Sequence, residues 1–308
     1  MILPSNQSPL GALPSHFRRP RVLIIGCGDV GLRVAKGLPQ RVHVLALTSS
    51  AHRVPELRAH HITPLVGNLD DERSLRRLAG LATYVVHLAP PPNALPTGTT
   101  DARTAALLRA LRLRALPSVL VYGSTSGVYG NCGGDWVDET RTVNPQTARA
   151  QRRVHAEGLL RVMGRATGTR VHVLRIPGIY APDREGGTPR ARLLRGAPVL
   201  VHTDDVYTNH IHATDLARAC RAAMWRGKPQ RVTHVNDDTQ LKMGDYFDMA
   251  ADLYGLDRPP RMRLEDARQQ LPALQLSFMA ESRRLVNQRL KRELRLTLRF
   301  PTAASGLA

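Results

Sequence analysis

A glycine-rich segment near the start of the chain separates a short apolar run from a helix-like run. The apolar run is Arg21–Ile25, the segment is Gly26-x-Gly28-x-x-Gly31, and Leu32–Ala35 follows. The first glycine permits a tight turn, the second lets the backbone approach a pyrophosphate, and the third lets helix and strand pack closely. The free N–H groups of a helix N-terminus also attract anions. We therefore predict a dinucleotide-binding loop whose contacts come from Gly26, Cys27, Gly28, Asp29, Val30 and Gly31.

Apolar runs and helix-like segments alternate along the first 180 residues. Continuous rather than alternating apolarity indicates strands that are buried on both faces, as in a parallel sheet covered by helices. The βαβ order predicts an α/β protein with a Rossmann-type doubly wound parallel sheet and a smaller C-terminal lobe. The expected strands lie at 22–25, 42–47, 62–66, 84–88, 119–122 and 171–176, and the expected helices follow residue 28 and lie at 56–60, 71–78, 101–113 and 148–163.

The pattern changes after residue 180, where proline and glycine become frequent. We expect a dinucleotide-binding domain over 20–180 and a substrate lobe over 181–303. Within that lobe, a strand and a helix over about 205–236 are expected to return to the first domain. Residues 1–19 are rich in proline and contain no cationic start followed by an apolar core, so we expect a disordered lead-in rather than a signal peptide.

The cysteines and apolar runs limit the compartment. Cys27, Cys132 and Cys220 are odd in number and form no Cys-x-x-Cys pair, which argues against a disulfide framework or a zinc knuckle. No apolar run approaches the roughly 18 residues of a membrane-spanning helix. We expect a cytoplasmic protein that has no membrane partner.

The charge of the chain raises the question of nucleic acid. The formal net charge is +19, from 44 Lys and Arg against 25 Asp and Glu. The arginines are spread along the sequence without a basic tail, and aromatic residues make up only 4%, so few rings are offered for base stacking. This distribution argues against nucleic-acid binding and favours a small-molecule substrate. The oligomeric state stays open, with a homodimer as one option.

The end of the second expected strand bears on the choice between NAD and NADP. An NAD site usually has an acidic residue there, about 20 residues after the glycine loop, to bind the ribose hydroxyls. This strand instead ends in Thr48, Ser49 and Ser50, and no acid occurs before Glu56. Hydroxyls with Arg53 close behind suit a 2′-phosphate, which needs donors and positive charge, although Arg53 fits a solvated helix residue equally well. We predict NADP as the cofactor rather than NAD, with contacts from Thr48, Ser49 and Arg53.

Two further residues follow the third expected strand. Asn68 is placed to reach the edge of an adenine, or equally to form an ordinary turn. Leu69 is its neighbour in the same segment. Both are included among the expected cofactor-binding residues.

From residue 21 to residue 301 the chain resembles the extended short-chain dehydrogenase/reductase superfamily, in particular its atypical members of the NAD-dependent epimerase/dehydratase-like type. This resemblance implies a nucleotide domain of about seven strands and a C-terminal substrate lobe. It also implies an active site in the crevice beyond the carboxyl ends of the strands. The segments that carry it are 26–31, 67–69, 86–89, 121–130, 174–180, 209–217 and 281–284.

The resemblance implies catalytic positions that this chain matches only in part. In that family a Ser or Thr after the fifth strand polarises the substrate oxygen, and Thr125 matches it. The Tyr-x-x-x-Lys pair of the next helix is replaced by Arg149 and Arg153. A guanidinium stays protonated and has no acceptor, so Arg149 cannot act as a general base. Arg153 can still place positive charge at a cofactor ribose, and Arg149 and Arg152 suit an anionic group of the substrate.

Other groups are candidates for the missing proton transfer. Asp101 stands where the family usually has an active-site Asn, although an Asp that begins a helix is the simpler reading. Tyr129 and Tyr180 are the other phenols expected near the crevice. His210 and His212 alternate as metal ligands can, but the resemblance assigns this stretch to the return into the first domain, so no metal is expected.

These observations lead to two hypotheses. The resemblance implies an NADP-dependent oxidoreductase or epimerase/dehydratase that acts on a small polar or sugar-nucleotide-like substrate. The loss of the Tyr/Lys pair supports an alternative, a catalytically silent NADP-binding protein that senses redox state.

Overall fold

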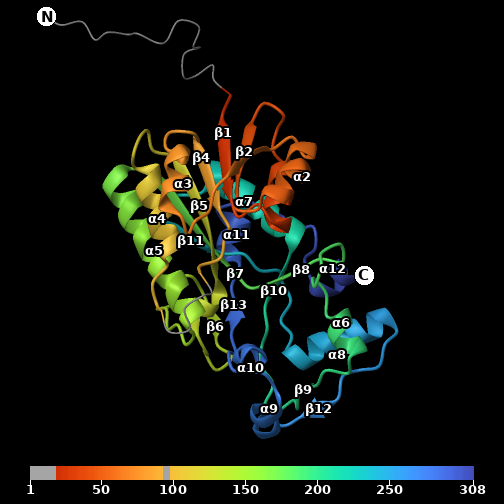
Figure 1. Ribbon diagram of the computed structural model, residues 1–308. Coiled ribbons are helices and arrows are strands. Elements are labelled where there is room, and N and C mark those ends of the chain that lie inside the picture. The colour runs from red at the N-terminus through yellow and green to blue at the C-terminus, as the bar shows by residue number, and fades with distance from the viewer. Residues whose placement is uncertain (1–18, 93–97) are drawn as a thin grey trace, which may run out of the picture.

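A seven-stranded parallel sheet forms the centre of the molecule, in the order β11-β7-β5-β4-β1-β2-β3 (Figure 1). The computed structural model describes residues 19–92 and 98–308, so the expected lead-in lies outside the described residues apart from residue 19. All neighbouring strands of this sheet are parallel, which confirms the predicted doubly wound α/β fold. The strands are β1 (Arg21–Ile25), β2 (His43–Thr48), β3 (Thr63–Val66), β4 (Tyr84–His87), β5 (Val119–Thr125), β7 (Arg170–Ile176) and β11 (Arg231–His234).

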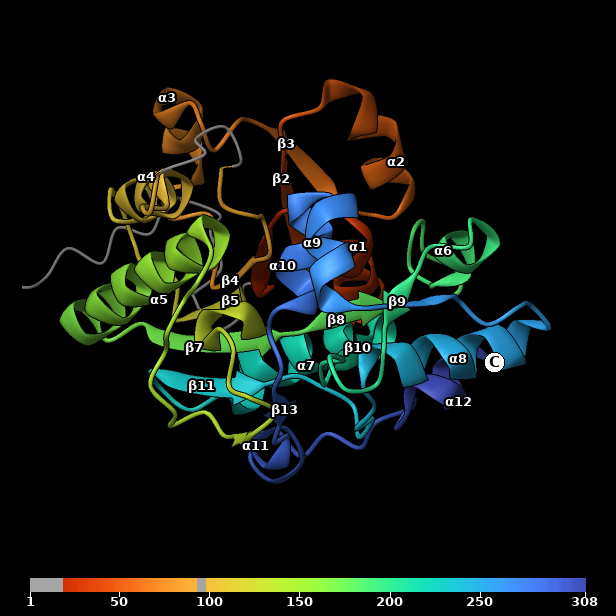
Figure 2. The same ribbon diagram turned by 90° about the horizontal axis from the view of Figure 1, so that it is seen from below.

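Helices cover both faces of the sheet, as Figure 2 shows for α4 and α5 on one side and α7 and α11 on the other. Val22 and Ile24 of β1 pack with α1, α2, α7 and α11, whereas Leu23 and Ile25 pack with α3, α4 and α5. Burial on both faces explains the continuous apolar runs. The helices are α1 (Asp29–Lys36), α2 (Val54–Ala59), α3 (Glu72–Leu75), α4 (Ala102–Leu111), α5 (Ala148–Thr167), α7 (Ala213–Arg226) and α11 (Gln288–Arg292), with 3₁₀ turns η2 (Ala51–Arg53), η3 (Arg76–Leu78) and η4 (Ser126–Tyr129).

Local sequence signals set the ends of the helices that flank the site. Asp101 caps α4 by accepting a hydrogen bond from the Thr104 N–H, and Thr147 caps α5 in the same way. Side-chain caps of this kind satisfy N–H groups that have no partner inside the helix. Helix α5 continues beyond its expected end at residue 163 and stops at Gly168, which has the left-handed conformation that favours glycine.

The C-terminal part of the chain forms a lobe with two small cores of its own. Within residues 205–236, helix α7 packs on the sheet and β11 forms its edge strand, whereas β10 pairs with β8 outside it. Leu290, Leu294 and Leu296 also pack against the sheet domain, which the sequence did not predict. The remaining elements are β6 (Trp136–Val137), β8 (Gly178–Tyr180), α6 (Arg190–Leu194), β9 (Val199–Leu200), β10 (His210–His212), α8 (Met243–Tyr254), β12 (Arg261–Met262), α9 (Leu264–Gln270), α10 (Ala273–Met279), β13 (Arg284–Leu285) and α12 (Ala303–Leu307).

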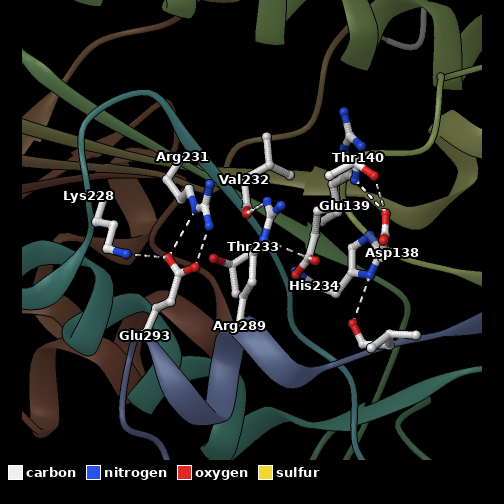
Figure 3. Close-up of polar contacts among 12 residues, drawn as sticks. Asp138, Glu139, Thr140, Lys228, Arg231, Val232, Thr233, His234, Arg289 and Glu293 are labelled. Atoms are coloured by element: carbon white, nitrogen blue, oxygen red, sulfur yellow. Dashed lines mark hydrogen bonds and ion pairs between the residues drawn. The ribbon is translucent and has the colours of Figure 1, made fainter.

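Side chains cover the free edge of β11 (Figure 3). The carbonyl of Val232 accepts a hydrogen bond from Arg289 of α11 at 3.0 Å, and the His234 N–H donates to Glu139 at 2.9 Å. Arg289 and Glu139 are themselves 3.4 Å apart. Edge strands expose unpaired backbone groups that invite pairing with another chain. These contacts occupy two such groups and hold α11 against the sheet.

Candidate functional site

A cavity of about 500 Å³ opens at the carboxyl ends of β1, β2 and β5. It lies beside the point where the strand order reverses between β1 and β4, which is where open α/β sheets bind their ligands. Most of the residues that we expected to contact the cofactor line this cavity. They are Gly26, Cys27, Gly28, Asp29, Val30, Gly31, Thr48, Ser49, Arg53 and Arg153.

The three glycines of the loop differ in what surrounds them. A Cβ on Gly26, where φ is +83°, would lie 2.4 Å from the backbone nitrogen of Ala89. A Cβ on Gly31 would lie 3.1 Å from the carbonyl oxygen of Gly26, whereas a Cβ on Gly28 would meet no protein atom within 4 Å. Helix α1 begins directly after Gly28, and no side chain caps its N-terminus. The loop therefore leaves open space and free N–H groups where a pyrophosphate would fit.

The end of β2 brings hydroxyls and one guanidinium into the same cavity. Arg53 donates to the carbonyl oxygen of Cys27 at 2.6 Å and to Glu56 at 2.9 Å. Its hydrogen bond with Glu56 keeps the pKa of Arg53 above its ordinary value. Thr48 and Ser50 form a turn through the Thr48 hydroxyl. Arg53 is thus oriented by the glycine loop itself.

Asn68 and Leu69 do not line this cavity. The side chain of Asn68 accepts a hydrogen bond from the Asp70 N–H at 3.0 Å, which is the ordinary turn role. Leu69 packs against the core beneath α3, α4 and α5. Neither residue is placed by the structure against the expected cofactor.

A second cavity of about 610 Å³ continues from the first toward the C-terminal lobe. Thr125, Arg153 and Pro177 line both cavities. The second lining is rich in arginine and aromatic rings, and among the residues that the structure describes Glu281 is its one carboxylate. The residues that give it this character are Arg149, Arg192, Arg283, Tyr207, Tyr246, Phe247 and Phe278.

The sequence over 22–236 matches the family model described as the NAD dependent epimerase/dehydratase family. This match covers more than half of the chain. The chain belongs to this family. No curated protein sequence matches it significantly.

Solved structures share the fold of this family member over almost its whole length. A functionally unknown conserved protein from Silicibacter pomeroyi is 29% identical, with a TM-score of 0.78 over 94% of this chain and 96% of that chain. UDP-glucose 4-epimerase from Thermotoga maritima, solved with UDP-glucose, is 19% identical, with a TM-score of 0.75 over 93% and 96%. UDP-glucuronic acid 4-epimerase from Bacillus cereus, solved with NAD, is 18% identical, with a TM-score of 0.72 over 93% and 96%.

In this epimerase/dehydratase family member, arginines at the two positions of the expected Tyr/Lys pair lie on α5 and line the second cavity. Arg153 donates to the carbonyl oxygens of Gly123 at 2.7 Å and Ala89 at 3.4 Å, and to the Tyr122 hydroxyl at 3.1 Å. Arg149 is exposed, with its guanidinium 4.9 Å from the centre of the Phe278 ring. Both supply positive charge, and neither can accept a proton.

Thr125 and Asp101 have different environments. Thr125 is the last residue of β5, and its hydroxyl accepts a hydrogen bond from the Gly127 N–H at 3.2 Å at the junction of the two cavities. Asp101 is 1% exposed, and its carboxylate accepts from the N–H and the hydroxyl of Thr104. It lines neither cavity. The structure thus supports the helix-capping reading of Asp101.

The other phenols that we considered as proton donors are buried away from both cavities. The Tyr129 hydroxyl lies 2.5 Å from His234 and accepts from Arg175 at 2.6 Å, and burial raises its pKa to about 12. The Tyr180 hydroxyl donates to the carbonyl oxygen of Thr302. Arg152, expected to face an anionic substrate, is buried instead and donates to the carbonyl oxygen of Gly98.

The sequence reasoning missed three functional candidates in the second cavity, which are Arg192, Arg283 and Glu281. Arg192 packs 4.4 Å over the Phe247 ring, and one of its buried guanidinium nitrogens has no hydrogen-bond partner in the described structure. Arg283 donates to Glu281 at 2.8 Å. The only sequence signal was the segment 281–284, which carried the family resemblance without indicating a role for any residue.

Glu281 lies close to Thr125 across Gly127. One carboxylate oxygen of Glu281 would be 3.8 Å from a Cβ on Gly127, and the Thr125 hydroxyl would be 3.6 Å from the same point. The side chain of Glu281 is 13% exposed and is held by Arg283. The two oxygens are therefore at most about 7.4 Å apart, and Glu281 lines the same cavity as the hydroxyl that the family resemblance implies for polarising the substrate.

The structure also locates the residues considered for metals, disulfides and membranes. His212 accepts a hydrogen bond from the Thr214 N–H, and His210 stacks on Tyr246. Within 19–92 and 98–308, no group of three or more His, Cys, Asp or Glu residues could hold a metal ion. The three cysteines are free and buried. Over the same ranges, no helix has the length and apolar character that crossing a membrane requires.

Proposed function

We propose that this chain is an NADP-dependent oxidoreductase or epimerase of the extended short-chain type, acting on a small anionic substrate. One observation carries this proposal. The cavity formed by the glycine loop is continuous with an arginine-rich cavity, and Thr125 and Arg153 lie where the two meet. Nicotinamide chemistry requires such a junction, because the substrate carbon must approach the cofactor ring.

The second cavity favours a substrate that carries phosphate or carboxylate. Arg149 and Arg192 have no carboxylate within ion-pair distance among the described residues, and Arg192 has an unpaired buried nitrogen. Guanidinium groups bind phosphate and carboxylate in a bidentate manner. Two proteins of similar fold were solved with UDP-glucose or with NAD. We propose a sugar-nucleotide-like substrate on this basis.

Proton transfer in this proposal falls to Glu281. A nicotinamide dinucleotide held by the glycine loop would supply the hydride acceptor or donor. Thr125 would donate a hydrogen bond to the reacting substrate oxygen, and Glu281 would accept the proton when that oxygen becomes a carbonyl. Arg283 would hold the carboxylate in position. Arg149 and Arg153 would contribute positive charge alone.

We expect NADPH to bind more tightly than NADH, because Arg53 and the hydroxyls after β2 suit a 2′-phosphate. One charge-assisted hydrogen bond is worth about 1.5 to 3 kcal/mol, which corresponds to about tenfold or more in affinity. Calorimetric titration of both cofactors measures the ratio. Arg53→Ala should bring it close to one, whereas Arg58→Ala, on the exposed surface of α2, should leave it unchanged. Equal affinities in the unmodified protein would contradict the NADP preference.

Glu281→Gln should lower kcat by about 10² to 10⁴, the usual contribution of general acid/base catalysis. The test follows nicotinamide absorbance with UDP-glucose, UDP-glucuronate and a panel of aldehydes and ketones. Glu265→Gln, which removes an exposed carboxylate of α9, is the matched control and should keep full activity. Cofactor affinity should stay the same in both variants.

Two outcomes of that experiment lead elsewhere. Full activity of Glu281→Gln would remove Glu281 from the mechanism while leaving the oxidoreductase proposal intact. Tight NADPH binding with no turnover in the unmodified protein would instead support the catalytically silent redox sensor, an alternative that the arginines at positions 149 and 153 favour.

A further inference from the structure

Two cavities hollow the surface at the amino ends of the strands, at the opposite end of the sheet from the cofactor crevice. One measures about 840 Å³ and lies at the starts of β1 and β2, and the other measures about 510 Å³ and lies beside the start of β4 and the end of α7. Pro39 and Val42 line both, so they form one surface, at the top of the sheet in Figure 1 where the chain enters β1. We call it the amino-end face, defined by Arg21, Lys36, Arg41, Tyr84, Arg221 and Trp225.

The amino-end face is positively charged and is not neutralised from within the chain. Neither cavity is lined by Asp or Glu among the described residues. Among the described residues, no carboxylate forms an ion pair with Arg21, Lys36 or Arg41. The side chains of His43, His60 and His61 also line the larger cavity.

The carboxylates of α2 and α7, two helices whose residues line this face, are already engaged. Glu56 is paired with Arg53, and Asp215 is fully buried, where it binds Arg218 and the N–H groups of Arg299 and Phe300. Residues 1–18, which lead into β1, contain no Asp or Glu. Neither α2 and α7 nor residues 1–18 therefore supply an unpaired carboxylate for this face.

Arginines from distant parts of the sequence thus meet at this face, namely Arg19, Arg21, Arg41, Arg218, Arg221 and Arg226. Asp29 is the only acid in the first 55 residues, and these residues supply the starts of β1 and β2. Many acids lie instead in the C-terminal lobe, at 245, 248, 252, 257, 265 and 266. Such an uneven distribution attracts polyanions to the positive side.

The amino-end face also exposes aromatic surface. Trp225 is 44% exposed, and its ring centre lies 6.2 Å from that of Tyr84. Arg221 and Arg226 are its neighbours on α7 and line the same cavity. Aromatic rings among cations are the combination that binds single strands, because bases stack on the rings while the phosphates meet the charges.

We propose that the amino-end face binds single-stranded nucleic acid. The phosphates would lie along Arg21, Lys36 and Arg41, and a base would stack on Trp225. A hollowed surface suits a flexible single strand, whereas a duplex is usually read by a helix or a ribbon that enters its groove. The site is separate from the cofactor crevice, so both ligands bind together.

The test uses fluorescence anisotropy with a labelled 20-nucleotide oligo(dT) and the full-length protein. The three phosphate contacts predict a salt slope of about −2, so affinity should fall about 20-fold between 50 and 200 mM NaCl. Lys36→Glu/Arg41→Glu should weaken binding by about tenfold or more. The matched control, Arg195→Glu/Arg263→Glu, makes the same change of net charge with two exposed arginines of the C-terminal lobe and should bind normally. Both double variants should bind NADPH like the unmodified protein.

Tryptophan fluorescence provides a second readout, because the chain contains only Trp136 and Trp225. In a Trp136→Phe background, oligo(dT) should quench Trp225 through stacking. Equal losses in the two double variants would overturn the proposal, since net charge alone would then explain binding. Displacement of the oligonucleotide by NADPH, tighter binding of duplex DNA, binding only to vesicles of acidic lipid, or no binding at 50 mM NaCl would each overturn it as well.

Discussion

Gly28→Val should abolish the binding of both NADH and NADPH while leaving the protein folded. A Cβ at Gly28 meets no protein atom within 4 Å, so the fold has room for the side chain. The same space is where, in the proposed function, the pyrophosphate would approach the N-terminus of α1. Loss of two charge-assisted hydrogen bonds, each worth about 1.5 to 3 kcal/mol, lowers affinity by about a hundredfold or more. Calorimetric titration measures the affinities, and circular dichroism checks the fold.

Gly26→Ala is the matched comparison within the same loop. Its Cβ would lie 2.4 Å from the backbone nitrogen of Ala89, at a residue whose φ is +83°. Strain of this kind costs on the order of 3 kcal/mol, so Gly26→Ala should lower the urea midpoint whereas Gly28→Val should not. Normal cofactor binding by Gly28→Val would show that the pyrophosphate does not use this loop.

Glu157→Gln should destabilise the protein by about 3 to 5 kcal/mol, because it leaves a buried charge without its partner. Glu157 of α5 binds Arg175 of β7 through both carboxylate oxygens, at 3.1 and 2.7 Å, and both side chains are about 5% exposed or less. Glu157 also accepts from Ser124, which adjoins Thr125. Urea unfolding, monitored by circular dichroism, gives the change in free energy.

Two comparisons make this stability prediction specific. Asp252→Asn removes one partner of the exposed Asp252–Arg258 pair and should leave the unfolding midpoint unchanged. The double variant Glu157→Gln/Arg175→Met removes the unpaired charge and should be more stable than Glu157→Gln alone. The comparison also needs the single variant Arg175→Met. If the double variant loses as much stability as Glu157→Gln and Arg175→Met lose in sum, Glu157 and Arg175 do not stabilise one another.

Much of the fold could be predicted because its determinants are local in the sequence. Strands β1, β2 and β4 of the central sheet consist largely of continuous apolar runs, and burial on both faces favours that composition. The Gly26–Gly31 segment lies between strand and helix, so its turn and its free N–H groups follow from adjacent residues. The four-residue spacing of Arg149 and Arg153 places them on one face of α5, and the structure places both in the second cavity.

The sequence by itself determined the doubly wound sheet, the glycine loop and the absence of the Tyr/Lys pair, because each depends on residues that are close together in the chain. Only the tertiary structure decided which charged groups meet. Packing of the lobe brings Glu281 into the same cavity as Thr125, and packing within the sheet domain buries Asp101 and Tyr129 in structural roles. It also gathers Arg21, Arg41 and Arg221 at one end of the sheet. Periodicity reports which side of an element is buried, but contacts between distant segments depend on how whole elements pack.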